Sequence, residues 1–405
     1  MKKIAFVSPW YGETIPGGAE MELRGLVHHL HDAGVPVEVL TTCVKDFSSN
    51  WAENVHPEGL TEENGIPVRR FRAGWRDSAA FDRVNWKLMN GRRITFTEEA
   101  TYLAEMVNSP RLYQYIADCG DRYSLFVFIP YLFGTTYFGS AAAGRKAVLI
   151  PCLHDESYAY FQMFRERFSQ VGGMAFNAPP EAELAHRLYD LSRVKTITPG
   201  IGMDTGIRGD AGRFCRKYGL EKPFILYAGR KDAGKNVDEL LDHVARMKSE
   251  GLIPELQVVL IGGGSIEIPA AIAGDVHDLG FVPAQDKYDA CAAAEFLCQP
   301  SRHESFSLVI MESWLCGRPV LVSGQCAVTR DFAGRSNGGL WFSGYQQFSA
   351  AVQWLLSHPD EAVQMGRSGG EFVRRSFDWD TVVHSYLTFF EEVARAAESE
   401  LGQNG

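Results

Sequence analysis

Short apolar runs alternate with amphipathic stretches along the whole chain. In the first half, the apolar and β-branched runs predict strands, and the stretches between them, such as 20–31 and 98–116, have the 3.6-residue periodicity of helices. The predicted strands are Ile4–Pro9, Val37–Thr42, Leu125–Pro130, Ala147–Cys152 and Val194–Thr198. This alternation is typical of a parallel sheet that helices cover on both faces.

A second series of the same kind begins at Pro223, with the runs FILYAGR, LQVVLIGGG, VHDLGFV, EFLCQPS and PVLVSGQ. Two such series predict an α/β protein with two facing, Rossmann-like, doubly wound domains, and a ligand in the cleft at the C-terminal strand ends. The glycines of Pro199–Asp210 permit a hinge, so we expect domains at 1–199 and 200–377. An amphipathic pattern from Phe377 predicts a final helix.

Composition narrows the class of protein. The 405 residues, 45% of them hydrophobic, suffice for two domains that each have a core. A net charge of −10 argues against nucleic-acid binding as the main task. Eight scattered cysteines form no metal-ligand cluster, which favours reduced thiols in a cytoplasm. No apolar run approaches the roughly 20 residues that cross a bilayer, so we expect a soluble or peripheral protein.

The stretch Gln299–Cys326, QPSRHESFSLVIMESWLCGRPVLVSGQC, is the most informative and predicts strand, loop, helix, stop and strand. A helix that begins near Ser305–Ser307 would present free N–H groups, which with the helix dipole form an anion site. Glu304 lies just before that site, and Glu312 projects from the second turn on roughly the same side. Two carboxylates there suit a nucleotide sugar, which carries phosphate and hydroxyls, although a solvated helix face would show the same spacing.

Three further features are less specific. Gly17 and Gly18 stand before a helix and would let a ligand approach the backbone, or they form a plain tight turn. Gly229–Lys235 fits the P-loop pattern G-x-x-x-x-G-K, but Asn236 stands where a Mg²⁺-binding Ser or Thr is required. His154, in IPCLHDESY, follows a predicted strand, where a structural histidine is the common alternative.

These motifs together resemble the retaining glycosyltransferases of family four, the group 1 glycosyltransferases, which have the GT-B fold. The segment PSRHESFSLVIMESWLCGRPVLVS is similar to their donor-site signature, with Ser305, Phe306 and Ser307 in place of Gly-Phe-Gly. Gly229-Arg230 with Lys235 resembles their G-R-x4-K pattern. The resemblance spans nearly the whole chain but is weak between about residues 46 and 121. In this family the last helix, here 378–405, crosses back to the first domain.

The resemblance implies roles for individual residues. Arg230 and Lys235 would hold the donor diphosphate, Glu304 would touch the transferred sugar, and His154 would reach the sugar from the first domain. These four form the expected catalytic set. The expected donor-binding residues are Gly17, Gly18, Arg230, Lys235, Gly263, Val282, Phe306, Ser307, Leu308 and Glu312, with Glu312 on the ribose and the base read mainly by backbone groups.

The sequence therefore predicts a retaining, metal-independent hexosyltransferase, with a nucleotide-diphosphate sugar of UDP or GDP as its donor and no separate cofactor. The expected acceptor is a glycan or a lipid-linked molecule in surface polysaccharide or glycoconjugate biosynthesis. The basic stretch 69–93 would meet an acidic acceptor or anionic lipid at the inner face of the membrane. The alternatives are a P-loop-like NTPase, a phosphorylase or sucrose-type synthase, and a non-catalytic protein of the same fold that binds sugar nucleotides or glycans.

Overall fold

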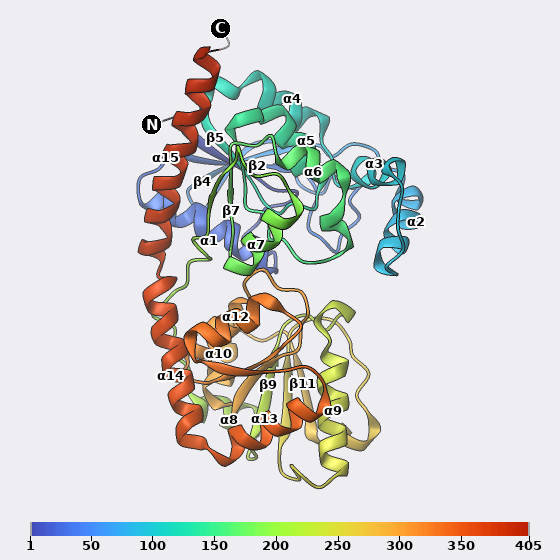
Figure 1. Ribbon diagram of the computed structural model, residues 1–405, viewed down its shortest axis with the longest axis vertical. Coiled ribbons are helices and arrows are strands. Elements are labelled where there is room, and N and C mark those ends of the chain that lie inside the picture. The colour runs from blue at the N-terminus through green and yellow to red at the C-terminus, as the bar shows by residue number, and fades with distance from the viewer. Residues whose placement is uncertain (1, 404–405) are drawn as a thin grey trace. The chain divides into compact units, whose positions relative to one another are not determined.

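The computed structural model describes residues 2–403, and the chain divides into two compact units (Figure 1). Unit 1 comprises Met1–Gly202 and Trp379–Gly405, and unit 2 comprises Met203–Asp378. The boundaries fall at 202/203 and 378/379, where the sequence places them at 199/200 and 377/378. The chain thus leaves unit 1 after its sheet is complete and returns to it with the last helix.

Unit 1 is built on a sheet whose strand order is β3-β4-β2-β1-β5-β6-β7-β8. Its strands are β1 (Lys3–Val7), β2 (Val37–Thr42), β3 (Gly59–Glu63), β4 (Ile66–Phe71), β5 (Tyr123–Phe128), β6 (Ala147–Leu149), β7 (Gly173–Ala175) and β8 (Lys195–Ile197). Neighbouring strands are parallel except β3 and β4, which are antiparallel. The predicted strands do not include β3, β4 and β7. β3 is an exposed edge strand, β4 (IPVRRF) contains a proline and two arginines, and β7 (GMA) has no β-branched residue.

The helices of unit 1 are α1 (Gly18–Asp32), α2 (Ser78–Met89), α3 (Phe96–Glu105), α4 (Pro110–Asp118), α5 (Gly134–Ala143), α6 (Gln162–Phe168), α7 (Pro179–Leu188) and α15 (Trp379–Gln403), with 3₁₀ turns η1 (Gly120–Arg122), η2 (Gly144–Lys146) and η3 (Ser157–Tyr160). The single helix expected over 98–116 is wrong. The chain forms α3 and α4 instead, because Pro110 has no backbone N–H to continue a helix and Ser109 caps a new one by accepting from Leu112 N.

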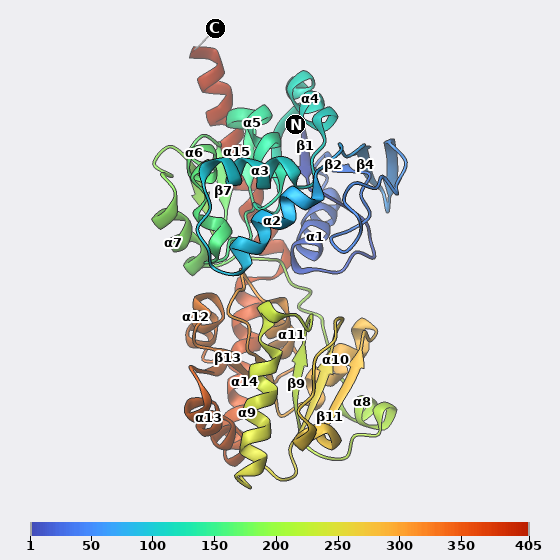
Figure 2. The same ribbon diagram turned by 90° about the vertical axis from the view of Figure 1, so that its right-hand side faces the viewer.

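Helices cover both faces of the unit 1 sheet (Figures 1 and 2). On one face, Leu26 of α1 and Tyr386 of α15 pack on the strands. On the other face lie α3 to α7, from which Leu103 of α3 and Phe164 of α6 pack into the core. Trp379 fixes the start of α15, since its ring stacks on His29 with 4.0 Å between the centroids. The last helix therefore belongs to the core of the N-terminal sheet.

Unit 2 has a parallel sheet with the strand order β11-β10-β9-β12-β13-β14. Its elements are α8 (Ala211–Tyr218), β9 (Phe224–Ala228), η4 (Ala233–Lys235), α9 (Val237–Ser249), β10 (Gln257–Ile261), η5 (Ala270–Asp275), β11 (Val276–Gly280), α10 (Ala284–Ala293), β12 (Phe296–Gln299), α11 (Leu308–Leu315), β13 (Val320–Ser323), α12 (Ala327–Ser336), β14 (Gly339–Phe342), α13 (Tyr345–Ser357) and α14 (Pro359–Ser376). Figure 1 shows α9 and α14 on opposite sides of this sheet. The strand order reverses direction between β9 and β12, which is where ligands bind in open α/β sheets.

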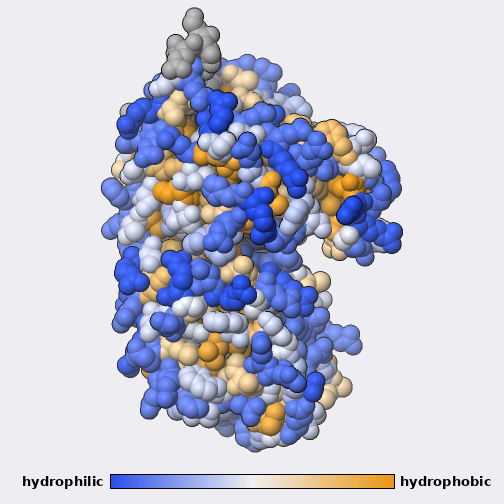
Figure 3. Space-filling view, viewed as in Figure 1, coloured by the Kyte–Doolittle hydropathy of each residue, from blue (hydrophilic) through white to orange (hydrophobic). Residues whose placement is uncertain are grey.

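The basic stretch 69–93 does not form one continuous charged surface. Arg69 Nε donates to Glu38 at 2.9 Å, and the buried Arg70 pairs with Glu63. Lys87 likewise pairs with Glu98, so three of the expected basic groups are neutralised within unit 1. In the part of Figure 3 where α2 and α3 lie, hydrophilic and apolar residues are exposed side by side. Among residues 2–403, no helix has both the length and the apolar character needed to cross a membrane.

All eight cysteines are free thiols, as the sequence predicts. One of them, Cys152, lies in a buried polar cluster of unit 1. There Asn177 Nδ2 donates to Glu22 Oε2 at 2.9 Å, and Cys152 Sγ lies 3.5 Å from the same oxygen. Glu181 accepts from the backbone N–H groups of Leu153 and Asn177 at 2.6 and 2.5 Å. Burial raises the pKa of Glu22 and of Glu181 to about 8.

These raised pKa values make the stability of unit 1 depend on pH. A carboxyl whose pKa is higher in the folded state than the unfolded value of 4.5 contributes fully to the free energy of unfolding below pH 4.5. That contribution is lost as the pH rises toward 8. We expect Glu22→Gln, which cannot ionise, to gain stability over the wild type as pH rises from 5 to 8, with a slope of at most about 1.4 kcal/mol per pH unit. Thermal denaturation across this range measures it. The exposed Glu53→Gln is the matched control, and a constant difference in both variants would contradict the prediction.

Candidate active site

The loops after β9 and β12 meet at the point where the strand order of unit 2 reverses. Both strands are parallel neighbours, so their carboxyl ends lie at the same edge of the sheet. The loop 229–236 carries Arg230 and Lys235, and the loop 300–307 carries Glu304. The structure thus brings together Lys235 and Glu304, which lie 69 positions apart in the sequence.

Lys235 and Glu304 form a direct ion pair, with 2.6 Å between Nζ and Oε1. Gln299, the last residue of β12, lies beneath them, and its Nε2 is 3.3 Å from both Glu304 Oε1 and Ser307 Oγ. We call Lys235, Glu304, Gln299 and Ser307 the switch-point chain. Sequence reasoning missed Gln299. A polar residue that ends an otherwise apolar strand was the available signal.

A glycine-rich loop after β10 runs beside the loop after β9. Gly262 has φ of +123°, and a Cβ there would lie 2.1 Å from Gly229 O, so this position requires glycine. Lys231 N donates to Gly263 O at 2.8 Å, and the buried Lys231 Nζ donates to Gly262 O and to Asp278. Lys231 therefore holds the two loops together, whereas its neighbour Arg230 has a side chain that is 62% exposed.

Gly263 and Val282, two expected donor-binding residues, lie in adjoining loops. A Cβ on Gly263 would come within 2.6 Å of the Phe281 ring, so the lack of a side chain lets this ring cover the glycine. Phe281 is itself 73% exposed, and Val282 is half-buried. An exposed aromatic ring over a bare backbone segment offers a flat apolar surface of the kind on which a base can stack.

Glu312 has a different environment from Glu304. It lies in α11, is buried, and pairs with Lys287 of α10 at 2.6 Å, while its Oε2 has no hydrogen-bond partner. Burial opposes the charge of Lys287, but the adjacent Glu312 carboxylate holds the pKa of Lys287 above its ordinary value. Lys287 was not found from the sequence, because nothing in the pattern of α10 links it to α11.

The helix after this loop, α11, begins at Leu308, close to the expected start. Gly317 has φ of +81°, which confirms it as the left-handed residue that ends the helix. The Phe306 side chain packs against Phe332 and Phe377, with 5.2 and 4.9 Å between ring centroids. Only its backbone is thus suited to a donor contact, since the ring belongs to the core.

The remaining expected residues lie in unit 1. Gly17 precedes α1 with φ of +140°, and a Cβ there would lie 2.0 Å from Glu20 Oε2, whereas a Cβ on Gly18 would meet no atom. His154 lies in the loop after β6, and its Nδ1 is 3.4 Å from Glu156 Oε1. Its side chain is 29% exposed, so the imidazole is accessible to a ligand.

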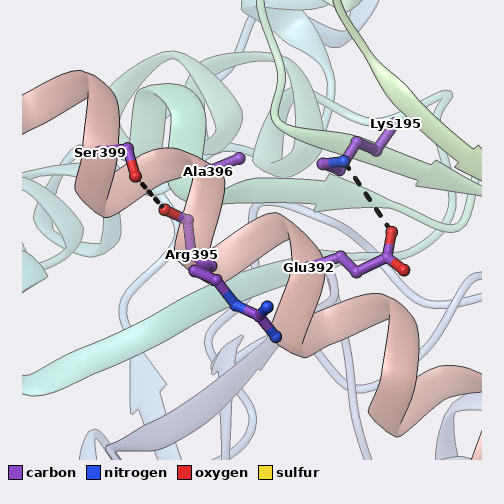
Figure 4. Close-up of a pocket in the computed structure, with 5 residues that line it drawn as sticks. All are labelled: Lys195, Glu392, Arg395, Ala396 and Ser399. Carbon is purple, nitrogen blue, oxygen red and sulfur yellow. Dashed lines mark hydrogen bonds and ion pairs between the residues drawn. The ribbon is translucent and has the colours of Figure 1, made fainter.

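Among the described residues, neither a metal-ligand cluster nor the surface hollow of unit 1 coincides with the expected site residues. In the described part of the chain, no group of three or more His, Cys, Asp or Glu residues is arranged to hold a metal ion. A surface hollow of about 270 Å³ lies in unit 1 between β8 and α15 (Figure 4). It is lined by Lys195, Glu392, Arg395, Ala396 and Ser399, and contains none of the expected site residues.

Residues 214–372 match the family model of glycosyl transferases group 1. This segment includes β9 to β14 and the whole switch-point chain. The chain carries a group 1 glycosyltransferase domain. The family resemblance inferred from the motifs is confirmed, and the domain matched by the model lies within unit 2, where the motifs are strongest.

Relatives of the group 1 domain include the D-inositol 3-phosphate glycosyltransferase of Jonesia denitrificans, 27% identical over 253 residues, which are 58% of this chain and 60% of that protein. The protein of the same name from Gordonia bronchialis is 28% identical over 247 residues, which are 56% of this chain and 53% of that protein. The chain thus spans between half and three fifths of the length of these relatives.

Solved structures with this fold include a sucrose-phosphate synthase from Thermosynechococcus elongatus, with a TM-score of 0.72, 17% identity, and coverage of 98% of this chain and 100% of that one. HepE from Anabaena, in complex with UDP and glucose, has a TM-score of 0.68 at 16% identity, covering 97% and 100%. The likeness confirms the expected GT-B fold, with two parallel-sheet domains.

The Lys287–Glu312 pair allows a test of the site's internal structure. Lys287→Met should lower the unfolding free energy by about 2–3 kcal/mol, because it leaves a carboxylate buried without its cation. Adding Glu312→Leu should restore most of the loss, since both charges are then gone. Urea denaturation of the single and double variants measures this. Lys222→Met, which breaks the exposed pair with Glu255, is the control and should change stability little.

Proposed function

We propose that this protein transfers a hexose from a nucleotide-diphosphate sugar to a hydroxyl group of a glycan or a lipid-linked acceptor. The observation that carries the proposal is the Lys235–Glu304 pair at the strand reversal of a group 1 domain. A cation suited to phosphate and a carboxylate suited to sugar hydroxyls lie within one hydrogen-bonded chain, next to the start of α11, which supports the proposal.

The proposed chemistry uses the charges of these loops. As the bond from the sugar carbon to the diphosphate breaks, negative charge grows on the phosphate oxygens. Arg230, Lys235 and the N–H groups at the start of α11 would stabilise that charge. The acceptor oxygen bonds to the same face of the sugar carbon, and its proton passes to the departing phosphate, so the sugar keeps its configuration. This route requires no protein nucleophile and no metal ion.

Donor binding would require a rearrangement of the switch-point chain. Lys235 Nζ lies 2.6 Å from Glu304, so the cation has to turn partly toward the diphosphate when the donor enters. The freed Glu304 carboxylate would then accept hydrogen bonds from the sugar. Glu312, with one unpartnered carboxylate oxygen, is the group we assign to the ribose hydroxyls. UDP is a reasonable first donor, because HepE was solved in complex with UDP and glucose.

Several details of the proposal stay predictions. Two of the relatives are D-inositol 3-phosphate glycosyltransferases, so inositol phosphates are to be tested as acceptors beside glycans and lipid-linked molecules. A place in surface polysaccharide or glycoconjugate biosynthesis also stays a prediction, as does contact of the exposed basic residues of 69–93 with anionic lipid at the inner face of the membrane.

The proposal can be tested directly. Thermal denaturation with UDP-, GDP-, ADP- and dTDP-sugars should show a rise in melting temperature for one base, because a ligand that binds the folded state stabilises it by mass action. The donor so identified is then incubated with sugar, inositol phosphate and lipid-linked acceptors. The transferred sugar should keep in the product the anomeric configuration, α or β, that it has in the donor. EDTA should leave transfer unchanged, whereas Mg²⁺-dependent hydrolysis of ATP or GTP would favour the P-loop alternative.

The Lys235 assignment gives a quantitative prediction. Lys235→Ala should remove a charge-assisted contact of about 1.5–3 kcal/mol, with more of the loss in kcat than in donor affinity, because the phosphate charge grows in the transition state. Steady-state kinetics and donor titration separate the two effects. Lys222→Ala, an exposed lysine of the same domain, is the control. Wild-type turnover in a folded Lys235→Ala variant would overturn the assignment.

His154 gives a prediction for unit 1. We infer that it acts on the sugar during transfer, while donor capture belongs to unit 2. His154→Ala should therefore keep donor affinity within a few-fold and lower the transfer rate by about 100-fold, the size expected for one positioned polar group. Single-turnover rates and donor titration measure the two quantities. Unchanged transfer would show that this histidine has only a structural role.

A further inference from the structure

The helices α10 and α11 of unit 2 pack against each other in a regular register. Lys287 Nζ of α10 lies 2.6 Å from Glu312 Oε1 of α11, and 25 positions separate these residues in the sequence. Arg318 Nε, just beyond the end of α11, donates to Ala292 O of α10 at 3.0 Å, across 26 positions. Because the offset is nearly constant, the residues of the turn between these two contacts also face one another.

Two cysteines occupy that turn. Cys291 lies four residues after Lys287 in α10, and Cys316 lies four residues after Glu312, at the end of α11. Residues four positions apart lie on the same side of a helix, so the two thiols face each other one turn beyond the ion pair. The Cys291 thiol is accordingly in hydrogen-bond contact with Cys316. The fold thus brings together two sulfur atoms that are distant in the sequence.

The two thiols differ in their access to solvent. Cys291 is 1% exposed, whereas Cys316 is half-buried and adjoins Gly317, the residue that ends α11. The hydrogen bond to Cys316 and burial raise the pKa of Cys291, which therefore stays a protonated thiol at neutral pH. A small oxidant thus reaches the Cys316 sulfur first, and Cys291 is placed to react with it afterwards.

We propose that Cys291 and Cys316 form a disulfide between α10 and α11 when the protein meets a small disulfide such as oxidised glutathione. The Cys316 thiolate attacks one sulfur of the small disulfide and releases one thiolate from it. The Cys291 sulfur then attacks the Cys316 sulfur and releases the second thiolate. The two protein thiols are oxidised by two electrons, and their two protons pass to the released thiolates, so the small disulfide is reduced to two thiols.

The disulfide acts on the ion pair one turn away. An S–S bond of about 2 Å draws together two sulfur atoms that are otherwise at hydrogen-bond distance, so α10 and α11 shift where they meet. The Lys287–Glu312 contact of 2.6 Å and the unpartnered Glu312 Oε2 lie in the adjacent turn. This consequence rests on the proposed function, in which Glu312 holds the ribose. Oxidation should therefore weaken donor binding about tenfold.

Cysteine variants of the full chain test the pair. After wild-type protein is incubated with oxidised glutathione, mass spectrometry of an alkylated, unreduced digest should find Cys291 linked to Cys316. In Cys291→Ala, the reaction should stop at the mixed disulfide, with one glutathione on Cys316. In Cys316→Ser, the buried Cys291 should stay a free thiol. Absence of the Cys291–Cys316 link in the oxidised wild type would overturn the inference.

Cys215→Ser is the matched control, because Cys215 is another half-buried thiol of the same domain. Arg213 and Lys217 of α8 pair with carboxylates of α10, and Cys215, two residues from each, points to the other side of its helix. This variant should form the link between α10 and α11 as the wild type does.

Titrations with UDP and GDP then compare the reduced and the oxidised protein. The wild type and Cys215→Ser should bind about tenfold more weakly after oxidation and recover with dithiothreitol, whereas Cys316→Ser should bind equally before and after. A cross-link that leaves both affinities unchanged would contradict the effect on Glu312 and leave the proposed function intact. A reduced wild-type protein that binds neither UDP, GDP nor any of their sugars would instead overturn the proposed function, while the cross-link is still read by mass spectrometry.

Discussion

The ion pair between Lys235 and Glu304 depends on one topological constraint, the reversal of strand order between β9 and β12. Each loop after these strands is short and departs from the same edge of the sheet. Their side chains therefore meet although the two loops are separated by two complete strand-helix units. The group 1 domain thus holds these opposite charges in place with backbone geometry.

Three lysines of this domain are each paired with a carboxylate. Glu304 neutralises Lys235, Glu312 neutralises Lys287, and Asp278 neutralises Lys231. The three pairs differ in exposure. Lys231 is buried against one carbonyl oxygen, that of Gly262, and one carboxylate, that of Asp278, so it has a structural role. The Lys235 side chain, in contrast, is 22% exposed and can turn toward a ligand. Lys231 and Lys235 look equivalent in the sequence RKDAGK, but their different burial gives them different roles.

Strained backbone conformations also lie close to expected site residues. Apart from asparagines, the described residues with left-handed, non-glycine conformations are Ser307 and Cys152. Ser307 adjoins the start of α11, and Cys152 lies two residues before His154. Strain of this kind persists only where surrounding contacts hold it, such as the Gln299 amide at Ser307 and the Glu22–Asn177 cluster around Cys152. Each unit therefore has a strained residue next to an expected site residue.

The sequence by itself determined the two α/β units, the positions of most strands along the chain, and the family, because apolar periodicity and glycine-containing loops are local properties. It also identified Arg230, Lys235, Glu304 and Glu312 as chemically suited to a nucleotide sugar, although their roles stay predictions. It failed where local signals were weak or misleading, as at the edge strand β3, the three-residue β7, and the break between α3 and α4 at Pro110.

Only the tertiary structure decided which charges meet. The partner of Lys235 lies in a loop after a different strand, and Lys287, the partner of Glu312, lies on another helix, so no spacing in the sequence reports either pair. The same holds for the basic stretch 69–93, whose apparent excess charge is reduced by Glu38, Glu63 and Glu98. Gln299 and Ser307 gained their significance in the same way, because burial and hydrogen bonding are set by neighbours that are distant in sequence or by a backbone angle that the residue type does not predict.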